Sequence, residues 1–299
     1  DKYCLVTVGH LPRFFDYSNQ LVYSKIERTK SIDEIEHPLV RNAMKFLHMN
    51  ELRIDYEADL PARSGLGTSS SFAVGLLHAF YALKGRFVDK KKLADDAIYL
   101  ERVLCNESGG IQDQIAAAFG GFNRIDFYDG GYDVTPMIIS ANRKKELNEN
   151  LMLFFTGFSR FSAELASEQT KNIPSKIALL KEMQSLVNDA YHILVSDKDL
   201  SEFGKLLDYT WKLKRGIASS ISNETIDGLY NKAIDAGALG GKLLGAGGGG
   251  FIILYVEKDK QQSVRKALNN LLYIPFEFEN DGSKVLYYQE EKYQSNNKD

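Results

Sequence analysis

The stretch Pro61-Ala62-Arg63-Ser64-Gly65-Leu66-Gly67-Thr68-Ser69-Ser70-Ser71 joins an alternating apolar segment to a helical one, and it decides the fold. Apolar residues at every second position from Leu52 to Leu60 predict a strand with one buried face. From Phe72 to Leu83 the apolar residues recur at helical spacing instead. A glycine-rich turn that opens a helix presents backbone N–H groups and the positive end of the helix dipole to an anion. We therefore predict a phosphate-binding loop here.

Two better-known phosphate loops do not match this stretch. The Walker pattern needs Gly-Lys-Ser/Thr at its end, and no lysine occurs between Pro61 and Leu83. The dinucleotide pattern needs a third glycine where Ser70 stands. A Ser/Gly turn that only caps a helix remains an alternative for this segment taken alone.

The bulk composition indicates a globular chain that acts on small molecules. It has 299 residues, 44% of them apolar, which is enough for a substantial core in two lobes. A net charge of -3 gives no general attraction to nucleic acid or to an acidic membrane, so neither is an expected partner. Cys4 and Cys105 lie in no disulfide or zinc-ligand spacing. With no apolar run of membrane-spanning length, we expect a cytoplasmic protein.

The order of the expected elements predicts an α+β fold. Polar residues from 140 to 150 form either a lobe boundary or a connecting loop, and we place two domains at 1–148 and 149–299. The expected strands cover residues 3–8, 20–27, 52–60, 122–128, 134–139, 151–155, 251–256, 275–279 and 284–289. The expected helices cover 38–48, 72–83, 90–104, an alanine-rich segment that ends at residue 120, and segments near 163, 175–194, 200–213, 225–236 and 260–272.

Glu101 is a candidate magnesium ligand. It lies close to the apolar stripe of its helix, where a carboxylate is costly unless a cation accompanies it. The alternative is a glutamate that bends out to solvent or pairs with a lysine.

Asp113 is the candidate catalytic residue, at the start of the alanine-rich helix. Glycines such as Gly110 before it and alanines after it leave room for a ligand to approach closely. A helix start is expected to hold a carboxylate ionised, as a base or an orienter of a hydroxyl must be. Alternatively, the aspartate only stabilises the first helical turn, and Glu107 is a less favoured candidate for the same role.

Four consecutive glycines, Gly247 to Gly250, come directly before the apolar strand that starts at Phe251. Glycine there costs conformational entropy, and packing does not account for it, whereas close approach of the backbone to a ligand does. A flexible surface linker is the alternative. Lys212, Lys214 and Arg215 form a small basic cluster that is either a solvated helix end or a contact for a substrate phosphate.

Three segments together resemble the GHMP small-molecule kinases. These are residues 61–71, Gly110-Ile111-Gln112-Asp113-Gln114 and residues 242–251, in the order and spacing of that superfamily's second signature, catalytic-aspartate region and third signature. The amino-acid sequence of three segments is similar to that of the D-glycero-D-manno-heptose 7-phosphate kinase branch. These segments are residues 116–125, 155–160 and 237–251.

The resemblance implies a ribosomal-protein-S5-like first lobe and a ferredoxin-like second lobe, with ATP and sugar in the cleft between them. It implies transfer of the γ-phosphoryl group of ATP to the anomeric hydroxyl of a heptose 7-phosphate. ATP and Mg²⁺ are the implied cofactors, and a small sugar phosphate is the implied partner. Asp113 would orient or deprotonate the hydroxyl, and Ser69 and Glu101 would hold magnesium.

The remaining implied site residues fall into two groups. The expected ATP-binding residues are Ala62, Arg63, Ser64, Gly65, Leu66, Gly67, Thr68, Ser69, Ser70 and Ser71. The expected substrate-binding residues are Gly110, Gly247, Gly248, Gly249, Arg160, Lys214 and Arg215, the last three for the substrate's phosphate.

The first strand and first signature of the superfamily do not occur in this sequence. We expect either that a segment precedes Asp1 or that the chain is a fragment, whose activity would then be in doubt. A non-catalytic sensor that binds ATP and sugar, and a decarboxylase or isoprenoid-pathway kinase, are the competing functions. Ser69, Glu101 and Asp113 together argue against a sensor.

Overall fold

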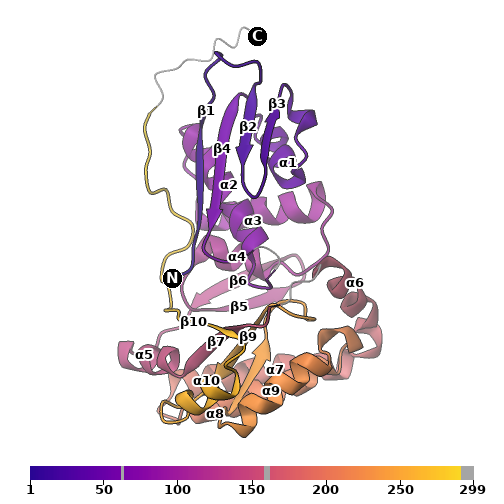
Figure 1. Cartoon of the computed structure of the whole chain (residues 1–299), viewed down its shortest axis with the longest axis vertical. Helices are drawn as coiled ribbons and strands as arrows, with labels where there is room; N and C mark the ends of the chain where they lie inside the picture. The colour runs from indigo at the N-terminus through magenta and orange to yellow at the C-terminus, as the bar shows by residue number, and fades with distance from the viewer. Residues whose placement is uncertain (62–63, 158–161, 291–299) are drawn as a thin grey trace. The chain divides into compact units, whose positions relative to one another are not determined.

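The computed structural model describes residues 1–61, 64–157 and 162–290, with backbone only at 162–165. The chain forms two compact units, which are coloured along the sequence in Figure 1. The N-terminal unit contains residues 2–61, 68–120 and the segment from 280 onward. The C-terminal unit contains Asp1, residues 64–67 and the described residues of 121–279. Residues 64–67 of the phosphate-loop segment therefore belong, by their contacts, to the unit built from the second half of the chain.

The N-terminal unit has a four-stranded sheet in the order β1-β4-β2-β3. β4 pairs antiparallel with β1 and parallel with β2, which in turn forms an antiparallel hairpin with β3. Alternation along β4 buries Leu52 and Ile54 and leaves Arg53 exposed, as the sequence predicts. The strands are β1 (Cys4–His10), β2 (Asn19–Val22), β3 (Ile26–Thr29) and β4 (Leu52–Ala58).

Helix α2 is the central helix of this unit. It contacts β1, where a Cβ added at Gly75 would lie 3.2 Å from the Val6 side chain, and it buries Leu76, Leu77 and Phe80. The helices are η1 (Ile32–Glu34), α1 (Pro38–Phe46), α2 (Thr68–Leu83), α3 (Lys90–Tyr99), the π-helix η2 (Leu100–Leu104) and α4 (Gln112–Phe119).

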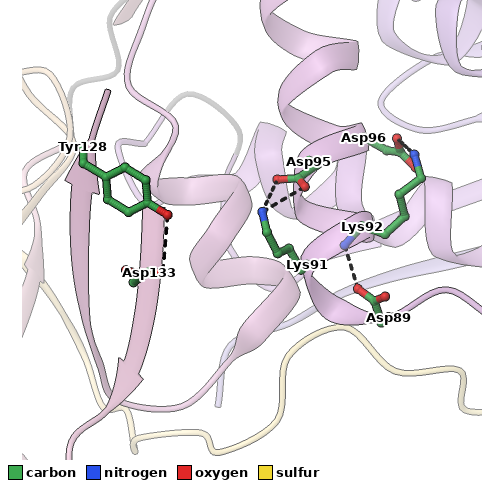
Figure 2. A network of polar contacts seen from close by, with 7 residues as sticks. All are labelled: Asp89, Lys91, Lys92, Asp95, Asp96, Tyr128 and Asp133. Atoms are coloured by element: carbon green, nitrogen blue, oxygen red, sulfur yellow. Dashed lines mark hydrogen bonds and ion pairs between the residues drawn. The ribbon is translucent and has the colours of Figure 1, made fainter. Parts of the chain in front are cut away.

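Polar side chains fix the start of α3, as Figure 2 shows. The Asp89 carboxylate caps the helix by accepting a hydrogen bond from the Lys92 backbone N–H at 2.8 Å. Lys92 also pairs with the buried Asp96 one turn on, and Asp96 accepts a further bond from Tyr81 at 2.6 Å. These contacts stabilise α3, which runs into the π-helix that carries Glu101.

The C-terminal unit contains a four-stranded sheet, β10-β7-β9-β8, in which every neighbouring pair is antiparallel, and a separate hairpin, β5-β6. Tyr128 and Asp133 form a 3.4 Å hydrogen bond across this hairpin (Figure 2). The strands are β5 (Asn123–Tyr128), β6 (Gly131–Pro136), β7 (Leu151–Phe155), β8 (Gly240–Leu243), β9 (Phe251–Tyr255) and β10 (Leu272–Ile274).

The faces of this sheet are covered by apolar side chains in two clusters. One cluster includes Leu254 of β9, Trp211 of α8 and Ile226 of α9, and the other includes Tyr255, Leu151 and Leu200. The helices are α5 (Ala141–Glu149), α6 (Ser162–Asn172), η3 (Ile173–Ser175), α7 (Ile177–Val195), α8 (Ser201–Arg215), η4 (Ser219–Ile221), α9 (Glu224–Asp235) and α10 (Gln261–Ala267).

Helix α8 lies very close to β8. A Cβ added at Gly240 would lie 2.0 Å from the Gly204 carbonyl oxygen, and one added at Gly204 would meet the Tyr255 ring at 2.6 Å. Glycine at both positions lets the helix backbone approach the strand backbone, which places the last turn of α8 beside the loop that follows β8.

The structure differs from the expected elements in four places. The strand expected at 20–27 is the β2-β3 hairpin, and the polar run 140–150 is helix α5, capped by Ser140. β8 was missed because Gly-Gly-Lys-Leu has no strand-forming residue. The closing strands expected at 275–279 and 284–289 are irregular, and β10 lies just before them.

Residues 121–148 pack with the C-terminal unit, because Phe122 and Met137 contact the cluster around Leu147 and Leu151. The proposed domain boundary at 148 stays a prediction. Among the described helices none combines the length and apolar character needed to cross a membrane.

Candidate active site

The two glycine-rich loops lie against each other although 180 positions separate them in the sequence. A Cβ added at Gly65 would lie 2.8 Å from the Leu244 carbonyl oxygen, and one added at Gly245 would lie 2.6 Å from the Gly65 Cα. Both glycines have positive φ, +84° and +74°. Gly250 lies equally close to the Ser64 backbone. The second and third signature segments thus form one backbone surface within the C-terminal unit.

This packing corrects the argument that only a ligand could explain the glycine run. A Cβ added at Gly247 would lie 2.7 Å from the Ile221 Cα, and one added at Gly250 would lie 2.1 Å from the Ser64 oxygen. Backbone-to-backbone packing therefore requires glycine at these two positions. Gly248 and Gly249 also have positive φ. That Gly247, Gly248 and Gly249 bind substrate stays a prediction.

Carbonyl groups of the loop that follows β8 are anchored by side chains from other elements. Gln169 of α6 donates to the Ala246 oxygen at 2.5 Å, and Lys214 of α8 donates to the Gly245 oxygen at 2.7 Å. Among the described residues no acceptor is found for the backbone N–H groups of Gly247 and Gly249. The loop therefore keeps donors that an anion can use.

The Ser64 hydroxyl adds a further unused group. Ser64 is buried, and its Oγ has no hydrogen-bond partner in the part of the chain that the structure describes. A buried hydroxyl without a partner is costly, and a ligand that bonds to it would remove that cost.

Glu101 is the centre of a polar cluster at the start of α2. Its side chain is 2% exposed, so the alternative of a glutamate bending out to solvent is wrong. Ser69 Oγ donates to one carboxylate oxygen at 3.1 Å, and Ser70 Oγ and Gln114 Nε2 donate to the other, Ser70 at 2.8 Å. Burial raises the pKa of the Glu101 carboxyl, and these three hydrogen bonds oppose the shift.

Asp113 lies in the first turn of α4, close enough to Glu101 that the two carboxylates repel each other. The position of Asp113 at a helix start predicted that the ionised form is favoured. Burial acts in the opposite direction and raises the pKa of the Asp113 carboxyl, against a weak 3.4 Å hydrogen bond from Gln112. A higher pKa makes this carboxylate a stronger base. Its neighbour Gly110 and the rival Glu107 are both exposed.

The donor set around Glu101 fits a magnesium ion. Mg²⁺ prefers oxygen ligands and is held in proteins by one or two carboxylates together with substrate phosphates. Ser69 and Glu101 supply a hydroxyl and a carboxylate, and Gln114 Oε1 beside them is buried with no donor among the described residues. In the described part of the chain no three His, Cys, Asp or Glu side chains form a metal site, so a bound nucleotide would have to complete the ligand shell.

The residues expected to bind a substrate phosphate differ in their surroundings. Lys214 faces the loop after β8, as described above. Arg215 forms a 2.9 Å ion pair with Asp227 and lies over the Trp211 ring. Arg160, like Ala62 and Arg63 of the first loop, lies outside the described residues. The remaining loop residues, Leu66, Gly67, Thr68 and Ser71, lie where the loop runs into the first turn of α2.

Two polar residues of these clusters were not predicted. Gln114 lies within a recognised motif, but only the folded arrangement of α4 against η2 brings it to Glu101. Lys242 lies on the unrecognised strand β8, and a lysine between two glycines and an apolar residue could have signalled a half-buried cation.

Comparison with known protein families agrees with this arrangement. Residues 38–121 match the GHMP kinases N terminal domain, and residues 180–274 match the GHMP kinases C terminal domain, together more than half of the chain. The chain belongs to the GHMP kinase family.

Individual members of the family show different degrees of similarity to this GHMP kinase. A D-glycero-alpha-D-manno-heptose 7-phosphate kinase from Campylobacter jejuni is 32% identical over 71% of this chain and 63% of its own length. A bifunctional fucokinase/GDP-fucose pyrophosphorylase from Arabidopsis thaliana is 26% identical over 85% of this chain and 25% of its own length. The chain thus spans less than two thirds of these two relatives.

A solved structure agrees over most of the chain. The crystal structure of a D-glycero-D-manno-heptose 1-phosphate kinase from Bacteroides thetaiotaomicron is 26% identical, with a TM-score of 0.68, over 96% of this chain and 89% of that one. The two-lobed α+β GHMP kinase fold expected from the sequence is therefore confirmed.

Proposed function

We propose that this GHMP kinase transfers the γ-phosphoryl group of ATP to the anomeric hydroxyl of D-glycero-D-manno-heptose 7-phosphate, which gives the 1,7-bisphosphate and ADP. The similarity to a heptose 7-phosphate kinase supports the choice of sugar. The convergence of Ser69, Ser70 and Gln114 on the buried Glu101, beside Asp113, is the observation that carries the proposed chemistry.

Asp113 would act on the sugar. In the proposed step the anomeric oxygen forms a bond to the γ-phosphorus while the bond from that phosphorus to the bridging oxygen of ADP breaks. The proton of the anomeric hydroxyl passes to the Asp113 carboxylate, whose pKa is raised by burial, which makes it a stronger base than an ordinary aspartate.

The loop residues would hold the phosphates in place. The unpaired N–H groups of Gly247 and Gly249, the Ser64 hydroxyl and the first turn of α2 offer donors without a lysine in the loop. Ser69 and Glu101 would hold Mg²⁺, which neutralises phosphate charge when bound. Phosphoryl transfer depends mainly on positioning and charge neutralisation, so these groups account for most of the expected catalysis.

A coupled assay of ADP release tests the proposal. The purified chain is incubated with ATP, Mg²⁺ and, in separate reactions, heptose 7-phosphate, galactose, fucose and mevalonate. We expect ADP release with the heptose phosphate and a new anomeric phosphate in the ³¹P spectrum, and a rate of release lower by about a hundredfold or more with the variant Asp113→Asn. Turnover of another acceptor alone would replace the proposed substrate. If ATP binds but no acceptor gives ADP release above background, the result favours the sensor and overturns the proposal.

A further inference from the structure

Two lysines from different elements of the C-terminal unit approach the loop that follows β8. Lys214 lies in the last turn of α8, and its Nζ donates to the Gly245 carbonyl at 2.7 Å. Lys242 is the third residue of β8 and lies one residue before the end of that strand. The two ammonium groups lie close enough to repel each other. The glycines that bring α8 onto β8 are the structural cause of this approach.

Lys214 differs from every other cation on its helix. Lys205 pairs with Glu202 at 2.7 Å, Lys212 with Asp208 at 2.6 Å, and Arg215 with Asp227 at 2.9 Å. Lys214 has only a neutral carbonyl as its partner, and neither it nor Lys242 has a carboxylate partner among the described residues. The other three cations of α8 each have a carboxylate partner, so the lack of one at Lys214 is not a general property of this helix.

Both lysines are partly buried, which makes the missing counter-charge costly. Burial, together with a smaller effect of the Lys242 charge, lowers the pKa of Lys214 to about 8. Burial also lowers the pKa of Lys242. Two like charges held close together away from water destabilise the protein unless an anion joins them. Such an arrangement is typical of a binding site.

We propose that Lys214 and Lys242 together bind a phosphate dianion of a substrate, and that Lys242, rather than the neutralised Arg215, is the second cation of that site. The inference rests on the proposed kinase function for the identity of the ligand. The phosphate belongs either to the acceptor sugar or to the nucleotide, since both carry phosphate groups and both would meet the glycine loops. The two sources predict different kinetic results.

Kinetics of the variants Lys214→Met and Lys242→Met distinguish these sources. With hydrogen bonds to charged groups worth about 1.5–3 kcal/mol, each loss should raise one Michaelis constant roughly tenfold to a hundredfold. A rise for the sugar phosphate alone assigns the site to the acceptor, and a rise for ATP alone assigns it to the nucleotide. Lys212→Met is the matched control, because it removes an exposed, paired lysine two residues away. Unchanged constants for both substrates in both variants would overturn the proposal.

Direct binding separates this inference from the proposed function. Titration of the chain with inorganic phosphate and with pyrophosphate, followed by ³¹P line broadening, needs no turnover. We expect the wild type and Lys212→Met to broaden the signal, and the Lys214→Met, Lys242→Met double variant to lose at least tenfold in affinity. Equal phosphate affinity in all three proteins would contradict the two-lysine site, even if the protein is an active kinase. If the chain shows no kinase activity but the double variant still binds phosphate more weakly, the two-lysine site stands and the proposed function is contradicted.

Thermal unfolding distinguishes an anion site from a purely structural role of Lys214 and Lys242. If Lys214 and Lys242 only held α8 to the loop, their replacement would lower the melting temperature. For an anion site, Lys242→Met removes an uncompensated charge, so the melting temperature of the unliganded chain should stay equal or rise while phosphate no longer raises it. A lower melting temperature together with unchanged stabilisation by phosphate would count against the proposal.

Discussion

At the scale of single residues, Glu101 is a carboxylate at a buried position, where its ionised form costs free energy. Glu101 accepts three hydrogen bonds from neutral donors and has no cationic side chain as a partner among the described residues. Neutral donors stabilise a buried carboxylate less well than a cation does, so its pKa is still raised. A cation supplied with the substrate would complete the arrangement, which is why we place Mg²⁺ and not a structural ion pair at this residue.

Asp113→Asn should abolish most of the activity and leave the fold intact. Asparagine has the same shape but cannot accept the proton of a sugar hydroxyl, and a positioned base is worth about 10²–10⁴-fold in rate. We expect kcat to fall within that range while the Michaelis constant for ATP changes little. The control is Glu107→Gln, which removes an exposed carboxylate and should behave like the wild type. Equal losses in both variants would mean that Asp113 has no special role.

The same substitution should increase stability at neutral pH. The folded-state pKa of Asp113 is raised above its ordinary value of 3.8, so ionising this residue costs more in the folded protein than in the unfolded chain. That cost is fully present above the folded-state pKa and disappears as the pH falls through it to below 3.8. In urea unfolding, the advantage of Asp113→Asn over the wild type should be largest near pH 7 and shrink toward pH 4. An advantage that grows as the pH falls would show the opposite shift.

At the scale of elements, periodicity predicted those whose sequence carries a clear pattern. The alternation before the first loop and the helical spacing after it correspond to β4 and α2. α5 was missed because its residues are almost all polar, and helix propensity rather than a buried stripe supports it. β8 was missed because glycine is chosen there for the approach of α8, a tertiary requirement that no local pattern reveals.

Part of the candidate site could likewise be predicted from the sequence, and part could not. Ser69 and Asp113 were predicted from motifs that are continuous in the sequence, and Glu101 was predicted from its place beside the apolar stripe of its helix. Two other features join segments that are distant in the sequence, so only the folded chain reveals them. They are the contact of the two glycine loops and the approach of Lys214 to Lys242.

Substitution of a loop glycine should show how much the contact between the two glycine loops contributes to stability. Gly65→Ala combines a positive φ of +84° with a Cβ only 2.8 Å from the Leu244 oxygen. Left-handed backbone costs an alanine about 1–2 kcal/mol, and the clash adds about 1–3 kcal/mol. Gly130→Ala is the matched control, with a φ of +85° and nothing within 4 Å of the added Cβ.

Urea unfolding of both glycine variants measures the difference. We expect Gly65→Ala to lose more unfolding free energy than Gly130→Ala by about 1–3 kcal/mol, which is the cost of the clash alone. If the two variants lose the same amount, the backbone of the first loop does not press against the loop after β8.

At the scale of the whole molecule, the chain passes five times between its two units. One crossing falls after residue 1, two fall between residues 61 and 68, and one each falls near residues 120 and 280, so each unit is assembled from separate segments of sequence. The first glycine loop leaves the unit of β4, packs with the loop after β8, and returns as α2. A ligand that binds this loop only in the folded protein should therefore raise the free energy of unfolding.

Stabilisation by a non-hydrolysable ATP analogue should depend on magnesium. A ligand that binds only the folded state at about a hundred times its dissociation constant adds about 2.7 kcal/mol to the free energy of unfolding. We expect the melting temperature to rise with analogue and Mg²⁺ and to rise less with analogue and a chelator.

In Ser69→Ala the two conditions should give nearly equal shifts, because the proposed hydroxyl ligand is gone while the phosphate donors of the loops remain. Ser185→Ala is the control that should keep the wild-type difference, because it removes an exposed hydroxyl of α7 that bonds to the Glu182 carbonyl of its own helix. A difference between magnesium and chelator that survives in Ser69→Ala would remove Ser69 from the metal site, and equal shifts in the wild type would remove the metal from the site altogether.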